Sequence, residues 1–389
     1  MKKIISSLVL IMLFFIILVT PNNSVNAEDT ITLNVFNWGE YIDEEVITEF
    51  ETAFPNVNVN YETFDSNESM YTKLTTGDAK YDVVIPSDYM IEKLIKEDLL
   101  VELDPDKMPN RNEISDEYYE KSKVFDPNNK YTIPYFWGTV GILYDTTKVN
   151  KPVDSWSILW DEDYKKDIFM YDSQRDSLMV ALKLLGKSMN TTNKDDLEEA
   201  KNKLIEQKPL VYSYVTDSVI QQMISGEAAL AVVYSGDASF IMSENENMAY
   251  AIPKEGTNFW IDSMVIPKTS QHVDLAHEFI NFMCKPEIAT KNTEYVMYSS
   301  PVESVFNTVK TEDWASNIAY NPEGIIDILG GDVQTEVFRD PGDFINEYDK
   351  VWSEVLAPKT NYIIPLIIGI VVIVGVGGYF LYSRKKKSY

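Results

Sequence analysis

Aromatic residues next to small polar or acidic residues recur along this 389-residue chain at points where strands are expected to end. Segments 37–41 (NWGEY), 86–89 (PSDY) and 234–237 (YSGD) each follow an expected strand, 259–263 (FWIDS) lies on one, and 298–301 (YSSP) follows a helix. Ligands of α/β sheets bind beyond the carboxyl ends of the strands, where helices start. The repeated signature therefore predicts a binding cleft rather than ordinary core packing.

The residue types in these segments suit one kind of ligand. Aromatic faces attract ammonium groups, by ~0.5–1 kcal/mol when exposed and ~2 kcal/mol when desolvated, and they also pack against methylene chains. Carboxylates add charge-assisted hydrogen bonds to amines. A sugar site would need more amide and arginine donors, and an amino-acid site would need an arginine, which none of these segments contains. The pattern predicts a small linear ligand with two or more ammonium groups.

Motifs of catalysis and of metal or cofactor binding are missing from the sequence. The two histidines, His272 and His277, do not have the spacing of a zinc-binding helix. No nucleophile elbow, phosphate-binding loop or dinucleotide fingerprint is present. We therefore expect no enzyme, no metal and no cofactor, with a glycosidase-like pair of carboxylates as the alternative. The formal net charge of −27 disfavours nucleic acid and favours cations.

The predicted secondary structure alternates strands with helices, as in a doubly wound α/β sheet. The first set of strands is expected at 31–35, 57–64 and 81–86, and its helices at 46–54, 69–75 and 89–97. The second set has strands at 138–144, 228–234 and 259–267, and helices at 177–185, 197–206 and 275–284. Ser87 and Asp88 are expected to cap the helix that follows them. A soluble stretch of this length exceeds one hydrophobic core, so we expect two lobes.

The two ends of the chain carry targeting patterns. A basic start, an apolar core and small residues up to Ala27 predict a secretory signal over 1–27, with an uncleaved anchor as the alternative. An uncharged stretch over 362–382 is long enough to cross a bilayer, and the basic tail over 383–389 should stay in the cytoplasm. The binding region should therefore lie outside the cell, at its surface, on a membrane anchor. Cys284 is the single cysteine, which excludes an internal disulfide.

Longer segments resemble the spermidine/putrescine-binding subunit of bacterial polyamine ABC transporters. The resemblance is carried by 36–41 (FNWGEY), 81–89 (YDVVIPSDY), 125–129 (FDPNN), 133–138 (IPYFWG), 185–192 (LGKSMNTT), 253–256 (PKEG) and 259–263 (FWIDS). These segments run in order over essentially residues 30–355. The resemblance implies a two-lobed, periplasmic-binding-protein-like fold of type II with two crossovers between the lobes. The implied bounds are 28–138 and 262–305 for lobe one, 139–261 and 306–355 for lobe two, and 356–361 for a stalk.

The resemblance also implies a set of ligand-binding residues. The aromatic residues that would box the aliphatic chain are Trp38, Tyr41, Tyr89, Tyr234, Trp260 and Tyr298. Asp262 and Asp176 would pair with amines, and the implied polar contacts are Ser87, Thr216 and Gln334. Three departures from the family pattern stand out: Tyr234 where tryptophan is frequent, Gly39 in place of a hydroxyl residue, and Ser173 in place of a carboxylate, with Asp172 beside it as a candidate. They leave the choice between spermidine and putrescine open.

The function implied by the resemblance is that of a transport receptor. Its lobes would close on a polyamine and present it to a membrane permease that a separate ATPase subunit energises, and we expect a monomer. A receptor for another cationic solute or a peptide, and a surface enzyme or adhesin, are the alternatives. Residues 356–361 (LAPKTN) and the apolar span behind them also resemble a sortase signal. Cell-wall attachment after Thr360 is therefore the alternative to a retained membrane helix.

Overall fold

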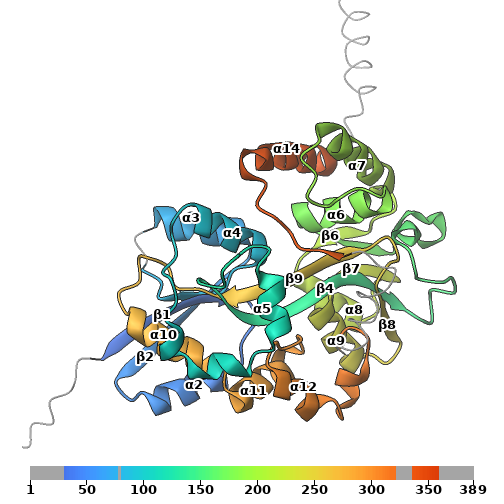
Figure 1. Cartoon of the computed structure of the whole chain (residues 1–389). Helices are drawn as coiled ribbons and strands as arrows, with labels where there is room; N and C mark the ends of the chain where they lie inside the picture. The colour runs from blue at the N-terminus through green and yellow to red at the C-terminus, as the bar shows by residue number, and fades with distance from the viewer. Residues whose placement is uncertain (1–29, 78–79, 321–334, 359–389) are drawn as a thin grey trace, which may run out of the picture.

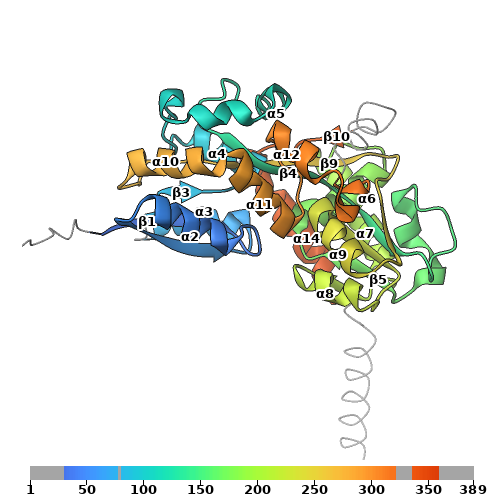
Figure 2. The same cartoon turned by 90° about the horizontal axis from the view of Figure 1, so that it is seen from below.

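The computed structural model describes residues 30–77, 80–320 and 335–358, which form two lobes of sheet and helix (Figures 1 and 2). The predicted signal over 1–27, the span over 362–382 with its basic tail, and Gln334 lie outside these residues, as does Thr360. No helix within the described ranges is both long and apolar enough to span a bilayer.

The first lobe is built on a parallel sheet of order β2-β1-β3, with β1 (Ile31–Trp38), β2 (Val57–Phe64) and β3 (Val83–Val84). Helices pack on this sheet because their apolar stripes meet its buried faces; Phe50 and Phe279, for example, lie with ring centroids 5.0 Å apart. The helices of this part of the chain are α2 (Glu44–Ala53), α3 (Asn67–Thr76), α4 (Asp88–Lys96), α5 (Asp116–Ser122), α10 (Val273–Met283), α11 (Pro286–Val296) and α12 (Glu303–Val309).

The second lobe holds a larger sheet, whose described strands run in the order β10-β9-β4-β7-β5-β6, with β8 paired to β4. The strands are β4 (Ile133–Asp145), β5 (Ile168–Tyr171), β6 (Ser213–Val215), β7 (Leu230–Tyr234), β8 (Met248–Ala251), β9 (Thr257–Met264) and β10 (Thr335–Glu336). The helices are α6 (Gln174–Leu184), α7 (Lys194–Gln207), α8 (Ser218–Ile224), α9 (Ser235–Glu244) and α14 (Ile345–Leu356). In Figure 1, α6, α7 and α14 cover one face of the sheet, and α8 and α9 cover the other.

Two long antiparallel strands connect the lobes. β4 pairs with β9 from Ile133↔Met264 to Thr139↔Phe259, and its far end pairs with β7 and β8. Beyond β9, Val265 forms an antiparallel bridge to Val84 of the first sheet. The backbone thus passes from one sheet to the other along β4 and returns along β9. Residues near the middle of these strands are placed between the lobes.

Most of the predicted elements are confirmed, but three details are wrong. The strand expected at 81–86 is reduced to Val83–Val84. The second sheet is mixed rather than doubly wound and parallel, because β4 runs antiparallel to β7, β8 and β9. Ser87 occupies the N-cap position of α4 without a capping hydrogen bond from its side chain, and Asp88 is already the first helical residue.

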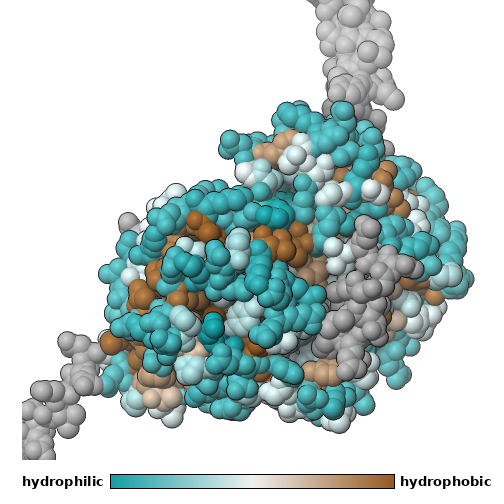
Figure 3. All heavy atoms as spheres, in the orientation of Figure 1, coloured by the Kyte–Doolittle hydropathy of each residue, from teal (hydrophilic) through white to brown (hydrophobic). Residues whose placement is uncertain are grey.

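The surface agrees with the acidic composition. The face seen in Figure 3 is mainly hydrophilic, and its hydrophobic residues gather in separate patches. Cys284 is buried at the end of α10. His277 is buried as well, and its Nε2 accepts a hydrogen bond from the backbone N–H of Asp104 at 3.0 Å. Both groups therefore serve the core of the first lobe.

Candidate functional site

Seven of the residues implied by the resemblance form one connected cluster where the lobes meet. Hydrogen bonds or ring contacts join each of them to another member, and they come from both lobes. The seven residues of this interlobe cluster are Tyr41, Ser87, Asp176, Tyr234, Trp260, Asp262 and Tyr298. Four of them lie on β7, on β9 or on α6, the helix that follows β5.

Asp262 forms the part of the cluster nearest to the first lobe. It lies on β9, is 6% exposed, and its Oδ2 accepts a hydrogen bond from the Tyr41 hydroxyl at 3.0 Å. Burial raises the pKa of Asp262 to about 7, although hydrogen bonds from Ser87 and Tyr41 oppose the shift. Its Oδ1 is buried without a donor. Ser87, whose side chain makes no capping hydrogen bond, is thus placed beside this carboxylate.

Asp176 forms the corresponding part in the second lobe. Its Oδ2 accepts hydrogen bonds from the hydroxyls of Tyr234 at 2.8 Å and Ser173 at 2.6 Å, while Oδ1 is buried without a donor. Burial raises the pKa of Asp176, and these two hydroxyls oppose the shift. Ser173 also caps α6, and its Oγ accepts from the N–H of Asp176. Ser173 therefore orients the carboxylate of Asp176.

A row of aromatic rings leads from one carboxylate to the other. The ring centroids of Tyr41 and Tyr298 are 5.3 Å apart, those of Tyr298 and Trp260 are 5.5 Å apart, and those of Trp260 and Tyr234 are 6.1 Å apart. Gly236 permits this packing, since a Cβ there would stand 2.3 Å from the Tyr298 ring. The row offers apolar faces and polar tips between two buried acids.

Two residues that hold the aromatic row in place were missed in the sequence. Asp237 accepts hydrogen bonds from the hydroxyls of Tyr298 at 2.7 Å and Tyr171 at 3.1 Å, so both of its oxygens have donors. The Tyr171 hydroxyl in turn accepts the N–H of Tyr234 at 3.0 Å. Burial raises the pKa of Asp237 to about 6. The segment YSGD was recognised as a signature, but its acidic residue was not assigned a role.

Tyr89 lies at one edge of the site beside an arginine. Its hydroxyl donates to Glu68 at 2.9 Å, and the guanidinium carbon of Arg175 lies 5.4 Å from its ring centroid. The same guanidinium carbon lies 4.5 Å from the ring centroid of Phe338 and 4.9 Å from that of Tyr348. The strand-end segments contain no arginine, and this one reaches the edge of the site from α6 instead.

The remaining residues implied by the resemblance are not members of the interlobe cluster. The Trp38 ring packs on Phe64 with centroids 4.5 Å apart, and its Nε1 is buried without an acceptor. Asp172 and Thr216 are exposed, and neither side chain hydrogen bonds to the interlobe cluster in the described structure. Gln334 lies outside the described residues.

The missed acid with the clearest environment is Asp88. It is 0% exposed, its Oδ1 accepts the N–H of Tyr89 at 2.7 Å, and its Oδ2 is buried without a donor. Burial raises its pKa well above the usual range, and the charges of Asp262 and Asp176 add to the shift. The sequence pattern assigned it to helix capping, which is the ordinary role of an aspartate at that position.

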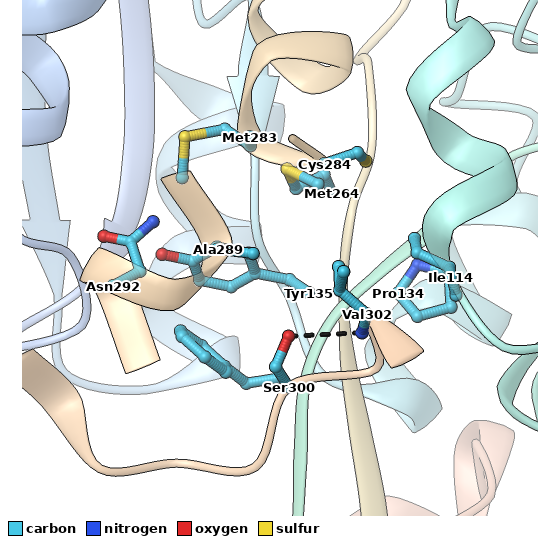
Figure 4. Close-up of a pocket in the computed structure, with 11 residues that line it drawn as sticks. Ile114, Pro134, Tyr135, Met264, Met283, Cys284, Ala289, Asn292, Ser300 and Val302 are labelled. Carbon is cyan, nitrogen blue, oxygen red and sulfur yellow. Dashed lines mark hydrogen bonds between the residues drawn. The ribbon is translucent and has the colours of Figure 1, made fainter. Parts of the chain in front are cut away.

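A small cavity in the first lobe is separate from this cluster. Figure 4 shows it between Met264, Met283, Cys284 and Asn292, and it has room for no more than about one water molecule. The described residues also contain no group of three or more acidic, histidine or cysteine side chains placed to hold a metal ion. The interlobe cluster therefore remains the candidate site.

Comparisons with known proteins agree with the geometry. The chain matches the bacterial extracellular solute-binding protein family over residues 45–322. It is 34% identical over 281 residues to the spermidine/putrescine-binding periplasmic protein of Escherichia coli, covering 72% of this chain and 80% of the relative. It is 30% identical over 344 residues to spermidine/putrescine-binding periplasmic protein 1 of Haemophilus influenzae, covering 87% and 92%.

Solved structures give the same result. A spermidine/putrescine ABC transporter protein from Listeria monocytogenes has a TM-score of 0.77 at 40% identity, covering 83% of this chain and 98% of that one. The substrate-binding protein PotD from Streptococcus pneumoniae has a TM-score of 0.72 at 39% identity, covering 84% and 98%. The two-lobed periplasmic-binding-protein fold is thereby confirmed. The chain belongs to the bacterial extracellular solute-binding protein family, among the relatives of the spermidine/putrescine-binding proteins.

Proposed function

We propose that this protein is the exported receptor of a polyamine importer. It binds spermidine or putrescine between its lobes and delivers the ligand to a membrane permease, which a separate ATPase subunit energises. The observation that carries the proposal is the aromatic row from Asp262 to Asp176, with a buried, donor-free oxygen at each end. Such a site needs a ligand that is cationic at both ends and apolar between them.

The ligand would supply what the two carboxylates lack. An ammonium group placed at Asp262 donates to Oδ1, and a second one donates to Oδ1 of Asp176, each as a charge-assisted hydrogen bond. The methylene groups between them pack on the faces of Trp260 and Tyr298, which also attract the charge. The hydroxyl of Tyr41 donates to Oδ2 of Asp262, and that of Tyr234 donates to Oδ2 of Asp176. These hydrogen bonds fix the orientation of each carboxylate and so the direction in which its Oδ1 accepts.

Closure of the lobes would bend the two connecting strands. We place the lobe boundaries at 28–138 with 262–305 and at 139–261 with 306–355, which puts the crossings within β4 and β9. Both halves of the site come together only when the lobes are closed, since Asp262 pairs with Tyr41 of the first lobe and Asp176 with Tyr234 of the second. Binding energy therefore goes partly into holding the closed form.

The tether is a proposal from sequence. Residues 1–27 would direct export, and 362–382 would anchor the protein in the cytoplasmic membrane with the lobes outside; sortase cleavage after Thr360 is the alternative. Fractionating cells separates the two. Release by detergent supports the membrane helix, whereas release only by enzymes that digest the wall supports the sortase product.

Titration calorimetry of the purified protein tests the proposed function. Heat with spermidine or putrescine that saturates at one ligand per chain is expected. No heat at millimolar concentrations of either amine would overturn the proposal. Heat only with another cationic solute or a peptide would assign the same site to a different ligand.

A further inference from the structure

Three buried carboxylates of this protein share an unusual feature. Among the described residues, Asp88, Asp176 and Asp262 are the acidic residues that keep one buried oxygen without a hydrogen-bond donor while the other oxygen accepts at least one. A buried charged group without a partner is costly, by an amount that depends strongly on its surroundings. Two of these acids are the proposed amine partners, and the third calls for an explanation.

Asp88 lies within the site by its position in the fold. It stands between Ser87 and Tyr89, directly beyond the carboxyl end of the sheet that contains β3. Its side chain is entirely inaccessible to solvent, and within the described structure its donor is the N–H of the next residue. The sheet end is the part of an α/β fold where ligands bind.

The segment that contains Asp88 contacts the neighbours of both other acids. The N–H of Ser263, next to Asp262, donates to the carbonyl of Pro86 at 3.2 Å. The ring centroid of Tyr89 lies 5.4 Å from the guanidinium carbon of Arg175, next to Asp176. Both Asp262 on β9 and Asp176 on α6 act on its pKa, whereas neither of these two is among the main groups that shift the pKa of the other. Asp88 is thus within electrostatic reach of both ends of the site. The contacts of Pro86 and Tyr89 thus place Asp88 between the segment of Asp262 and that of Asp176.

The nearby arginines do not neutralise Asp88 by direct contact. The Arg175 guanidinium donates to Asn190 at 3.0 Å and to the carbonyl of Arg339 at 3.3 Å. The Arg339 guanidinium donates twice to Glu92, at 2.9 and 2.8 Å. Both cations act on Asp88 only over a distance, so its Oδ2 keeps its capacity to accept.

A chain of ammonium groups fits this arrangement better than one metal ion. The acids are not gathered into a group that could hold a metal within the described residues. Each of the three instead has one oxygen to offer. A linear ligand with three ammonium groups matches three separate acceptors, whereas a diamine leaves one of them unpaired.

We propose that Asp88 binds the central ammonium group of a linear triamine, and that the site thereby prefers a triamine to a diamine. This inference rests on the proposed function, because it assigns Asp262 and Asp176 to the terminal amines. It names a residue and a ligand class that the resemblance left open. The serine at position 173 has then not reduced the number of acids in the site, since Asp88 supplies the third.

The Asp88→Asn variant tests the inference with a matched set of ligands. The amide keeps an oxygen that can accept the N–H of Tyr89 and removes only the charge. The probes are spermidine, putrescine and 1,8-diaminooctane, which has a methylene group in place of the central nitrogen of spermidine and nearly the same distance between its terminal nitrogens. Asp195→Asn, at an exposed aspartate on α7 outside the interlobe cluster, is the matched control.

The expected results separate a ligand contact from a structural role. Wild-type protein should bind spermidine at least about tenfold more tightly than 1,8-diaminooctane, since a charge-assisted hydrogen bond is the difference. Asp88→Asn should weaken spermidine binding about tenfold or more and change diaminooctane binding less than about threefold. Equal losses for all three amines, or no loss for spermidine, would overturn the inference while leaving polyamine binding intact.

A second measurement covers a variant that folds poorly. Wild-type protein alone must discriminate spermidine from 1,8-diaminooctane, and equal affinities for the two would overturn the inference without any substitution. Failure of the wild-type protein to bind any of the three amines would overturn the proposed function, and this inference with it. Asp195→Asn should reproduce the wild-type affinities for all three ligands.

Discussion

The carboxylates inside the interlobe cluster differ in electrostatic state from two glutamates outside it, Glu92 and Glu336, which we call the rim carboxylates. At the rim, burial of Glu92 is outweighed by two hydrogen bonds from Arg339 and one from the N–H of Asp340, and its pKa is lowered. Glu336 is likewise buried in part but paired with Lys183, and its pKa is lowered. Inside the cluster, burial raises the pKa of Asp176 and Asp262, and no lysine or arginine side chain pairs with either within the described residues.

The difference separates acids that stabilise the fold from acids that await a ligand. A rim carboxylate has its cation within the chain, so it contributes to the stability of the ligand-free protein. A site carboxylate is desolvated without a cation, so its charged form is disfavoured until an ammonium group arrives. Removing charge should therefore have opposite consequences in the two sets.

The largest effect is expected for Asp262→Asn. Loss of the charge removes a charge-assisted hydrogen bond of about 1.5–3 kcal/mol, so polyamine affinity should fall about 10- to 100-fold. The thermal midpoint of the ligand-free variant should not fall, because the removed charge is unpaired. Calorimetry and thermal unfolding measure the two quantities. An affinity within threefold of wild type would remove Asp262 from the site.

The next effect concerns the aromatic face. Trp260→Ala should weaken polyamine binding at least about tenfold, because the desolvated cation–π contact and the packing on methylene groups are both lost. Trp260→Phe should recover part of the affinity, since it keeps an aromatic face. Equal affinities of the alanine variant and wild type would show that the ring only fills the core. Comparing this loss of affinity with that of Asp262→Asn separates the contribution of the carboxylate charge from that of the aromatic ring.

The sequence predicted which residues gather between the lobes better than it predicted the sheets. Trp260 and Asp262 were recognisable because an aromatic residue and an acid recur at strand ends, and strand ends converge in α/β folds. Ser87 was an implied ligand contact as well as an expected cap, but Asp88 was assigned to capping alone, because the local pattern is that of a helix start. The mixed second sheet was not predictable from alternation alone, since strand direction depends on long-range pairing.

A pH dependence should follow from the uncompensated acids. The folded-state pKa of Asp262 is about 7 and that of Asp237 is about 6, both above the ordinary value of 3.8. Between the ordinary pKa and these raised values, the ligand-free folded protein therefore binds more protons than the unfolded chain. The stabilisation that the two acids contribute to the free energy of unfolding accordingly falls as the pH rises from about 4 to about 7. An ammonium group lowers the pKa of Asp262, so binding should release protons near about pH 6.5.

Two measurements check this dependence. Calorimetry at about pH 6.5 in phosphate and in imidazole buffers should give different apparent binding enthalpies, because the released protons are taken up by buffers with different ionisation heats. Polyamine affinity should rise about threefold or more between about pH 5.5 and 7.5. Asp262→Asn should lose most of both effects. Identical enthalpies in the two buffers would show that Asp262 is already ionised in the ligand-free protein.

The smallest effect is expected at the rim, where charge removal should act on the fold rather than on the ligand. Glu92→Gln leaves Arg339 without its carboxylate, and since the arginine is partly exposed the loss should be about 1 kcal/mol. The thermal midpoint of the ligand-free protein should fall by about 2–4 °C.

Because Glu92 lies on α4 of the first lobe and Arg339 follows β10 of the second sheet, the pair also joins the lobes. Polyamine affinity should therefore fall by no more than about threefold, through easier opening. A tenfold loss of affinity at unchanged stability would place Glu92 with the site carboxylates and remove the distinction between the two sets.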